Sequence, residues 1–495
     1  MRIGTLEQGI IDALIGIVGA EHVLTTPAAR WQAMGGASYL DYVRHRSGDL
    51  HGLPDAVVMP ADHEQAQSVV ETCSRAHVVI VPAGGGTSVV GGLAVGRPHV
   101  LLSTHRMRGV VSIDDQSCLV TVQPGITGPS LEAILAARGL TLGHLPQSWQ
   151  RASIGGYLAT RSAGQASTGY GRSDDMVESA TLATPTGSWR VGHTPASAAG
   201  PDLLQVAIGS EGAFGMITEA TLRVRRRPQA QRYEAWIFPD FSSGVAAFRG
   251  LAQSRIPADV MRLSDAEEPE TTLLMSAPSG LLGRGVDAYL KRRGIRRGSA
   301  ALAILGWEGA EEAIVRARRG PAVDILRGHG AVSLGRRPGA SWQRHRFEGP
   351  HLREALMDAG YLVETVETAT SWATMGTLRE SMHAALRTSL TSAHTRPYVM
   401  THVSHVYETG ASLYTTVIAV ADQADPVTQW TVAKTAVSDA IVSGGGTITH
   451  HHAVGRDHAP WLEAEIGRLG VDVLRAVKAT VDPHGICNPG VLGLT

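Results

Sequence analysis

VVIVPAGGGTS, residues 78–88, is the stretch of this chain that decides its fold. An apolar run typical of a buried strand leads directly into three consecutive glycines at 84–86. Glycines let neighbouring backbone N–H groups turn toward one point, and Thr87 and Ser88 add hydroxyl donors. The loop is therefore predicted to hold the diphosphate of a dinucleotide. The alternative is a plain glycine turn between two strands.

The surroundings of this loop exclude a Rossmann fingerprint. Its spacing is not GxGxxG, and it continues into VVGG at 89–92 instead of an amphipathic helix. Residues 62–76 are predicted to form a helix before it, because Ala66, Val69, Val70 and Cys73 recur at helical spacing. Strands are expected at 54–60, 100–102, 110–113 and 119–122, and a further helix at 130–138. The fold class is therefore α+β.

Bulk properties place the chain among globular proteins of two or three domains. It has 495 residues, 43% hydrophobic and 18% charged, with a formal net charge of −1. This balance argues against a nucleic acid partner. Three widely separated cysteines, Cys73, Cys118 and Cys487, indicate a reducing compartment, and no signal peptide or transmembrane segment is recognisable. We expect a cytoplasmic protein; peripheral membrane contact and a homodimer stay open.

Changes in composition along the chain suggest four segments. Residues 1–50 read as a helical and irregular segment, and 51–228 as a dinucleotide-binding domain rich in glycine loops. Glycines become fewer after Arg225–Pro228, which marks the start of a substrate (cap) domain over 229–445. Residues 446–495 are rich in motifs again and would return to the cofactor. Weak periodicity leaves 267–339 without a fold prediction. Further glycine loops at 153–164 and 209–215 suggest one long cofactor touched at several points.

Five motifs, taken in order, carry a family resemblance. They are PAGGGTS (82–88), PGITG (124–128), SIGGYLATRSAG (153–164), GSEGAFGMITEATLRV (209–224) and DPHGICNPG (482–490). Together they resemble the vanillyl-alcohol-oxidase-type (PCMH-type) FAD-binding family. The resemblance implies a two-part FAD-binding domain with an α+β cap domain. Because the glycine loop contains no histidine, FAD is expected to be bound non-covalently.

The resemblance also implies which residues hold FAD. Residues 82–88 would hold the diphosphate, 148–153 and 160–163 would line the isoalloxazine and ribityl, and 211–217 would complete the groove. The full set is Pro82, Ala83, Gly84, Gly85, Gly86, Thr87, Ser88, Gln147, Ser148, Trp149, Gln150, Arg151, Ala152, Ser153, Thr160, Arg161, Ser162, Ala163, Glu211, Gly212, Ala213, Phe214, Gly215, Met216 and Ile217.

The second half resembles the alkyldihydroxyacetonephosphate synthase branch of that family. The resembling stretches are VMRLSDA, HLREALMDAGYLVET, ETATSW, ETGASLY and TITHHHAVG. This branch exchanges the acyl group of an acyl-dihydroxyacetone phosphate for a fatty alcohol in ether lipid synthesis, without net redox change. By resemblance, Tyr414 would be the acid/base, His450, His451 and His452 would shuttle protons and bind substrate, Arg353 would hold the phosphate, and Arg262 would lie near flavin N5.

Elementary chemistry agrees with these residue types. A phosphate dianion favours the planar fork of an arginine, and a tyrosine becomes a usable base when neighbouring cations lower its pKa. Simpler interpretations exist: Tyr414 as core filling, and the histidines as a surface triplet or weak metal site on a strand, with at most two facing inward.

An FAD-dependent D-2-hydroxy acid dehydrogenase or oxidase is the main alternative function. Such enzymes often carry two metal-binding histidines in an H-x-G-D-G-N-x-H pattern. The stretch from His405 to Tyr414 lacks the second histidine and the acidic pair, so no metal is predicted. An aryl-alcohol oxidase and a binding module without catalysis fit the candidate residues less well.

Overall fold

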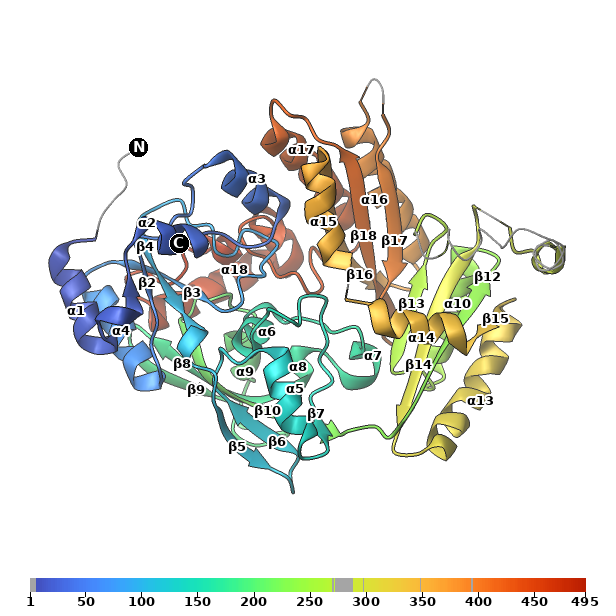
Figure 1. The fold of residues 1–495 in the computed structure, drawn as a ribbon, viewed down its shortest axis with the longest axis horizontal. Coiled ribbons are helices and arrows are strands. Elements are labelled where there is room, and N and C mark those ends of the chain that lie inside the picture. The colour runs from blue at the N-terminus through green and yellow to red at the C-terminus, as the bar shows by residue number, and fades with distance from the viewer. Residues whose placement is uncertain (1–5, 269–270, 272–287, 297, 348, 393–394) are drawn as a thin grey trace. The chain divides into compact units, whose positions relative to one another are not determined.

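The computed structural model describes residues 6–268, 271, 288–296, 298–347, 349–392 and 395–495 (Figure 1). Two compact units make up the chain. The first consists of Met1–Gly164, Arg172–Arg226 and His451–Thr495, and the second of Gln165–Gly171 and Arg227–His450. Part of the stretch 267–339, for which the sequence predicted no fold, lies outside the described residues.

The first unit mixes short helices and strands. Its helices are α1 (Gln8–Val18), η1 (Ala20–His22), α2 (Pro27–Gln32), α3 (Tyr39–Ser47), α4 (His63–Arg75), η2 (Thr104–Arg106), α5 (Gly128–Ala136), α6 (Ile154–Thr160), α8 (Ser173–Met176), α9 (Leu204–Ala207), η3 (Ala459–Trp461), α18 (Leu462–Val481) and η4 (Val491–Gly493). Its strands are β1 (Val23–Leu24), β2 (Ala56–Val58), β3 (Val79–Ala83), β4 (His99–Ser103), β5 (Val110–Asp114), β6 (Leu119–Val122), β7 (Leu140–Thr141), β8 (Val177–Thr184), β9 (Gly187–Val191), β10 (Met216–Arg223) and β11 (Arg225–Arg226). The helices and strands predicted for 54–138 are confirmed, with small shifts at their ends.

Two sheets share the helix α4. The four-stranded sheet has the order β1-β2-β4-β3, and the five-stranded antiparallel sheet has the order β5-β6-β10-β8-β9. Asp62 begins α4 by accepting a hydrogen bond from the Gln65 N–H at 2.9 Å. The four apolar residues that predicted this helix are completely buried, in one cluster with residues of β3, β4, β8 and β10. The apolar face of α4 therefore joins the two sheets.

The second unit is built on one antiparallel sheet of seven strands. Its strands are β12 (Ala230–Phe238), β13 (Val260–Ser264), β14 (Ala301–Gly309), β15 (Val332–Gly335), β16 (Tyr361–Ser371), β17 (Tyr398–Val403) and β18 (Gly410–Val420), in the order β15-β12-β14-β13-β17-β18-β16. Its helices are α7 (Ser167–Tyr170), α10 (Phe241–Gln253), α13 (Glu312–Gly328), α14 (Arg336–His345), α15 (Gly349–Asp358), α16 (Met375–Leu390) and α17 (Pro426–Ser443).

Helices cover one face of this sheet along its length. α10 and α13 pack against β12–β14, and α16 and α17 pack against β16–β18 (Figure 1). Side chains alternate along β13: Leu263 contacts Gly244 of α10, so its neighbour Arg262 projects from the opposite face. That opposite face is where the polar residues of the next section lie. Among the described residues, no helix is long and apolar enough to cross a membrane.

Candidate functional site

The glycine loop packs backbone against backbone on a second predicted cofactor segment. β3 ends at Ala83, and no helix or strand follows until β4. A Cβ on Gly85 would lie 2.1 Å from the Arg151 carbonyl oxygen and 2.8 Å from the Ala152 Cα, and one on Gly84 would lie 2.1 Å from the Ser153 Oγ. Any side chain there would push the two segments apart.

The loop offers a row of unused donors. Within the described parts of the chain, no hydrogen bond uses the backbone N–H of Gly85, Gly86, Thr87 or Ser88. All four residues are partly exposed. Consecutive free amides form a concave donor set that suits an anion such as a diphosphate. The donors present thus fit the expected dinucleotide.

A polar clamp holds the glycine loop to the C-terminal segment. Arg456 donates to the Gly91 carbonyl at 2.7 Å, to the Asn488 Oδ1 at 2.9 Å and to the Pro489 carbonyl at 2.7 Å. Asn488 donates to the Gly92 carbonyl at 3.0 Å and to the Glu211 carbonyl at 2.7 Å. The motif around Asn488 was recognisable in the sequence, but Arg456 was not predicted, because an arginine-rich chain gives it no distinguishing signal.

The carboxylate of Glu211 is hydrogen-bonded to the backbone of residues 454–455. The buried side chain accepts hydrogen bonds from the backbone N–H of Val454 at 2.9 Å and of Gly455 at 2.8 and 3.0 Å. Burial raises the pKa of Glu211 to about 7, against the opposing effect of these amides and of Arg456. The Glu211 carboxylate therefore links its segment to residues 454–455, and its predicted contact with the cofactor stays a prediction.

The rest of the predicted segment 211–217 faces the protein core. Ala213, Phe214, Met216 and Ile217 are buried, the first two in a cluster with α18. A Cβ on Gly212 would lie 2.9 Å from the Pro82 Cδ. Only the backbone of this segment can therefore serve a ligand.

Residues 147–163 form a turn and the short helix α6. Ser153 caps this helix by accepting from the Gly156 N–H at 3.3 Å, and Thr160 donates to the Gly156 carbonyl at 2.9 Å. Arg161 pairs with Asp174 at 3.1 Å. This segment lies next to the glycine loop through 151–153, and its predicted contact with the flavin stays a prediction.

Ser162 contacts a histidine that the sequence patterns did not single out. Its Oγ lies 2.7 Å from the Nε2 of His144, and both side chains are buried. Burial lowers the pKa of His144 to about 3, so this imidazole is neutral. Its ring also stands edge-on to Tyr157, with centroids 4.6 Å apart.

Four cross-strand neighbours line one face of the seven-stranded sheet in the second unit. Tyr414 on β18 lies directly opposite Glu367 on β16 and His402 on β17. His402 in turn lies opposite Ser264, two residues from Arg262 on the same face of β13. The structure therefore brings the predicted Arg262 and Tyr414 onto one surface, with His402 between them.

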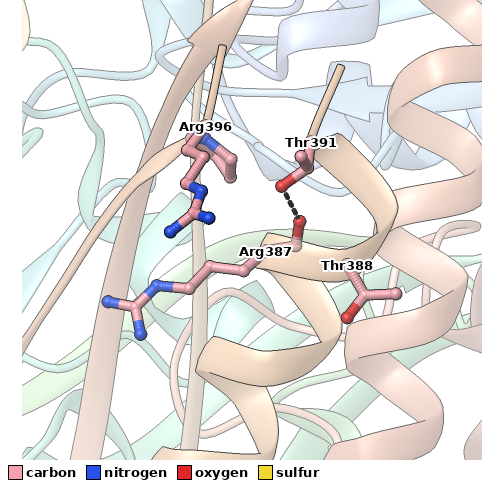
Figure 2. Close-up of a pocket in the computed structure, with 5 residues that line it drawn as sticks. Arg387, Thr388, Thr391 and Arg396 are labelled. Atoms are coloured by element: carbon pink, nitrogen blue, oxygen red, sulfur yellow. Dashed lines mark hydrogen bonds between the residues drawn. The ribbon is translucent and has the colours of Figure 1, made fainter. Parts of the chain in front are cut away.

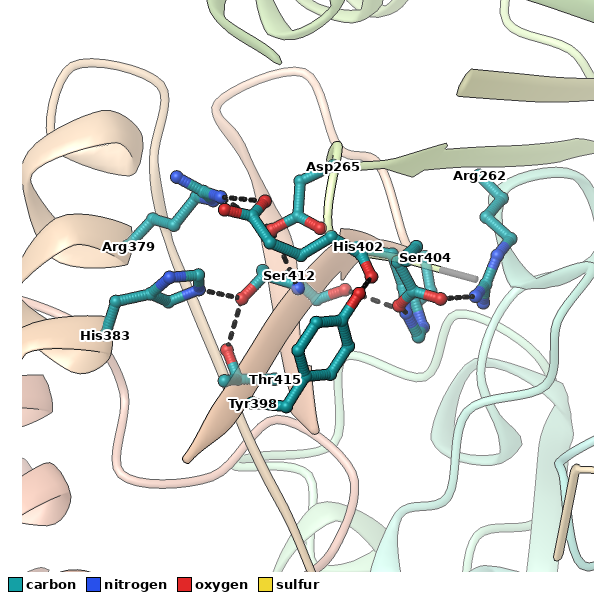
Figure 3. A network of polar contacts seen from close by, with 12 residues as sticks. Arg262, Asp265, Arg379, His383, Tyr398, His402, Ser404, Ser412 and Thr415 are labelled. Atoms are coloured by element: carbon teal, nitrogen blue, oxygen red, sulfur yellow. Dashed lines mark hydrogen bonds and ion pairs between the residues drawn. The ribbon is translucent and has the colours of Figure 1, made fainter. Parts of the chain in front are cut away.

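Glu268 connects these residues. Its carboxylate accepts from the Arg262 Nη2 at 3.2 Å and from the His402 Nδ1 at 2.8 Å (Figure 3). The His402 ring stacks on Tyr414, with centroids 4.9 Å apart and planes 22° apart. Burial alone would raise the pKa of Glu268, but Arg262 and His402 outweigh it and hold the value at about 2. Neither Glu268 nor His402 was predicted.

Tyr414 does not have the lowered pKa expected from its residue type and neighbours in the sequence. Burial is the largest influence and raises its pKa, with Glu364 and Glu367 acting in the same direction. A hydrogen bond with Thr365 and the charge of Arg353 oppose this and do not outweigh it. The expectation was wrong because carboxylates and burial, as well as cations, surround the ring. The hydroxyl is held protonated.

Arg353 already has an anionic partner. It lies on α15 and forms an ion pair with the buried carboxylate of Glu364 on β16. A substrate phosphate would have to share this guanidinium with Glu364. Its predicted phosphate-binding role stays a prediction.

The predicted strand through the histidine triplet is wrong. Residues 444–458, all of them described, form no helix or strand. Side chains of β16, and not the regular backbone hydrogen bonds of a strand pair, hold this segment. Glu367 accepts from the His450 N–H at 2.8 Å and from the Thr449 hydroxyl at 2.7 Å. Thr368 donates to the Thr447 carbonyl at 2.6 Å. Three glycines at 444–446 precede this stretch and favour its irregular path.

His450 is the buried member of the triplet. Its Nε2 lies 2.6 Å from the Tyr407 hydroxyl, and its ring stacks on His405 at 4.9 Å. His405 is hydrogen-bonded through Nδ1 to Ser167. His451 and His452 are half-buried, and their rings meet edge to face at 4.7 Å. Tyr407 and His405 are further polar residues that were not predicted from the sequence.

A separate surface hollow contains none of the predicted residues. It has a volume of about 620 Å³ and is lined by Arg387, Thr388, Thr391, Arg396 and Pro397 (Figure 2). The Thr391 hydroxyl donates to the Arg387 carbonyl at the end of α16. All but Pro397 are exposed.

Comparison with known proteins gives this geometry a class. Residues 54–192 match the FAD binding domain family, and residues 227–492 match the family of FAD linked oxidases, C-terminal domain. A solved structure of p-cresol methylhydroxylase with bound substrate shares the fold, with a TM-score of 0.76 at 16% identity over 100% of this chain and 98% of that one. The predicted α+β, PCMH-type fold is confirmed: the protein is an FAD-dependent enzyme of this class.

Closer relatives define the branch. The chain is 33% identical over 462 residues to alkyldihydroxyacetonephosphate synthase of Dictyostelium discoideum, covering 92% of this chain and 76% of the relative. A solved structure of an alkyldihydroxyacetonephosphate synthase superposes with a TM-score of 0.83 at 30% identity, covering 99% of this chain and 87% of that one. The chain belongs to the alkyldihydroxyacetonephosphate synthase family, as the motifs indicated.

Proposed function

We propose that this enzyme exchanges the fatty acyl group of a 1-acyl-dihydroxyacetone phosphate for a fatty alcohol. The bond between C1 and the ester oxygen breaks, and a fatty acid leaves with that oxygen. The alcohol oxygen bonds to C1 and gives up its proton, so the products are an alkyl-dihydroxyacetone phosphate and a fatty acid. Atoms and electrons balance without an external oxidant. Family membership supports this reaction class.

One observation carries the proposal at the level of residues: Arg262, His402 and Tyr414 share one face of the seven-stranded sheet. A protonated tyrosine can give a proton to a departing carboxylate oxygen and later accept one from the incoming alcohol. The guanidinium supplies a fixed positive charge where negative charge develops. Together these groups can serve both halves of the exchange.

FAD belongs to this proposal as the resident cofactor. The amides of Gly85–Ser88 would hold its diphosphate without a covalent bond, and the backbone of 151–153 and 211–217 would line it. When bound, FAD supplies the reactive ring that lets the C1 substituent be exchanged without net oxidation. The chain's own residues bind it, orient it and manage protons.

Arg353 is the proposed contact for the substrate phosphate. An arginine can accept Glu364 on one edge of its planar fork and a phosphate on the other. Glu364 would then orient the fork before the substrate arrives.

A direct assay tests the reaction. The holoenzyme is incubated under nitrogen with palmitoyl-dihydroxyacetone phosphate and labelled hexadecanol, without an electron acceptor. We expect labelled ether product and palmitate in equal amounts. A parallel sample receives D-lactate or glycolate with a redox dye.

The outcomes separate two enzyme classes. Dye reduction by a hydroxy acid, without ether product, would establish the alternative D-2-hydroxy acid dehydrogenase and overturn the proposal. Ether product that depends on an added acceptor would show that the exchange is not redox-neutral.

The compartment and the physical setting are part of the same proposal. Cys73 and Cys487 are buried free thiols, which suits the reducing cytoplasm. Long-chain alcohols partition into bilayers, so substrate collection would involve transient contact with a membrane surface. A homodimer is an additional element of this proposal.

A further inference from the structure

Glu268 occupies an unusual position for a residue in a turn. It follows β13 closely in the sequence, yet its side chain is 7% exposed and contacts two strands at once. One partner, Arg262, lies six residues before it; the other, His402, lies 134 residues after it. A buried carboxylate without such partners would be strongly disfavoured.

The charge state of Glu268 fixes the tautomer of His402. A carboxylate with a pKa of about 2 is ionised across the physiological range and can only accept hydrogen bonds. The His402 Nδ1 must therefore carry the proton in their 2.8 Å contact. Glu268 thus sets both the orientation and the protonated edge of this imidazole, as carboxylates do for histidines in many sites.

The orientation of His402 is passed to Tyr414. The two rings lie nearly parallel at 4.9 Å, so rotation of the imidazole would collide with the phenol or leave it unsupported. The same carboxylate also holds the Arg262 guanidinium. Glu268 therefore fixes Arg262 directly and Tyr414 through His402. The proposed reaction assigns a chemical role to both Arg262 and Tyr414.

Further polar contacts on the same sheet involve Asp265, Thr401 and Thr415. Asp265 pairs with Arg379 of α16 at 2.6 Å, and His383 lies 2.7 Å from the Thr401 hydroxyl, itself 2.8 Å from the Thr415 hydroxyl (Figure 3). Thr401 and Thr415 project opposite to their neighbours His402 and Tyr414. These contacts tie the sheet to α16, and Thr401 and Thr415 make them on the face away from His402 and Tyr414.

We propose that Glu268 and His402 form a positioning pair that sets Arg262 and Tyr414 in their working geometry. The inference rests on the proposed function, because it requires Arg262 and Tyr414 to act in the exchange. Neither Glu268 nor His402 needs to touch the reacting atoms. Their contribution is to the rate of turnover and not to substrate binding.

A double-mutant cycle tests the pair in the FAD-loaded enzyme. Glu268→Gln keeps the shape and removes the charge, and His402→Phe keeps the ring over Tyr414 and removes the Nδ1 anchor. We expect each change to lower kcat about tenfold with KM for the acyl substrate within about twofold, and the double variant to fall no further. Such non-additivity indicates residues acting as one unit.

The control is a carboxylate of similar burial without a link to Tyr414. Glu234 on β12 is 1% exposed and accepts from Arg319 at 2.9 and 3.0 Å. Glu234→Gln should lower thermal stability as much as Glu268→Gln and leave kcat unchanged. An equal fall in kcat for both variants would show a general structural effect and overturn the inference.

Three further outcomes would contradict the pair. These are unchanged kcat in both single variants, losses that multiply in the double variant, and a change confined to KM. If Glu268→Gln does not fold, the cycle is repeated with Glu268→Asp in its place and with His402→Gln as the second variant. A loss of kcat is again expected for each. Tyr414→Phe is measured alongside: full activity there refutes the proposed role of Tyr414, whereas an inactive Tyr414→Phe with normal Glu268 and His402 variants refutes only the positioning pair.

Discussion

The two units of this protein build their polar sites by different means. In the first unit, glycines bring main chains together, and the side chains of Arg456, Asn488 and Glu211 hydrogen-bond mostly to backbone groups. In the second unit, side chains contact side chains across strands, as in the chain Arg262, Glu268, His402 and Tyr414. A backbone-built site tolerates few sequences at its glycines, whereas a side-chain-built site depends on partners that no local pattern announces.

We expect the largest effect from a substitution in the glycine loop of the first unit. Gly85→Ala places a methyl group 2.1 Å from the Arg151 carbonyl oxygen, so the loop must separate from 151–153. We expect loss of bound FAD, seen as loss of flavin absorbance per protein, and a destabilisation of about 1–3 kcal/mol or more.

Gly16→Ala is the matched control in the same unit. Gly16 lies inside α1, and a Cβ there would have nothing within 4 Å, so alanine should stabilise the helix by up to about 1 kcal/mol. Retention of normal FAD content by Gly85→Ala would contradict the role of the loop.

The next effect concerns the side-chain-built site. Tyr414→Phe removes the only titrating atom of that ring, and we expect turnover to fall at least about 100-fold while FAD stays bound. Tyr361→Phe, which changes an exposed tyrosine on the adjacent strand β16, should behave as wild type. Ether-product assays and flavin spectra of both variants give the answer; near-normal turnover in Tyr414→Phe would exclude it from the chemistry.

A smaller effect is expected at the substrate phosphate. Arg353→Lys keeps the charge beside Glu364 and loses the fork, so KM for the acyl substrate should rise about tenfold with little change in FAD content. Arg319→Lys replaces an arginine that also pairs with a buried carboxylate, and its KM should not change. An unaltered KM in Arg353→Lys would place the phosphate elsewhere.

The smallest effect is a pH dependence in the first unit. Because burial raises the pKa of Glu211 from 4.5 to about 7, the folded protein binds a proton there that the unfolded chain has released. The stabilisation from this proton is complete below about pH 4.5 and is lost as pH rises through 7.

Glu211→Gln isolates this contribution. The difference in unfolding free energy between wild type and Glu211→Gln should shrink or reverse by up to about 3 kcal/mol between pH 4.5 and 7.5, at about 1.4 kcal/mol per pKa unit. Parallel denaturant curves at several pH values measure it. A difference that does not vary with pH would mean that the hydrogen bonds from 454 and 455 keep Glu211 ionised throughout.

Sequence reasoning succeeded where local chemistry is restrictive. The run 78–88 predicted a strand and loop, and the period of Ala66, Val69, Val70 and Cys73 predicted α4, because few backbone conformations suit a glycine cluster or a helical apolar period. The ordered motifs identified the FAD-binding family for the same reason. The assigned roles of the individual cofactor residues and the predicted domain borders stay predictions.

It failed where distant partners decide the structure. The histidine triplet was predicted on a strand, but Glu367 and Thr368 of β16 hold that segment in an irregular path. The pKa of Tyr414 was expected to fall, but burial and two carboxylates raise it. Glu268 and His402 were missed because their contact spans 134 residues and neither lies in a recognisable motif.

The backbone partner of β3 comes from the C-terminal segment, which affects the order in which the site forms during translation. Ile80, at the second position of this strand, exchanges backbone hydrogen bonds with Ile486 and Asn488 at 2.9 and 2.8 Å. The strand that leads into the glycine loop thus acquires this partner only after residues 486–488 have been translated. The complete setting of the glycine loop should therefore form only when synthesis of the chain is nearly finished.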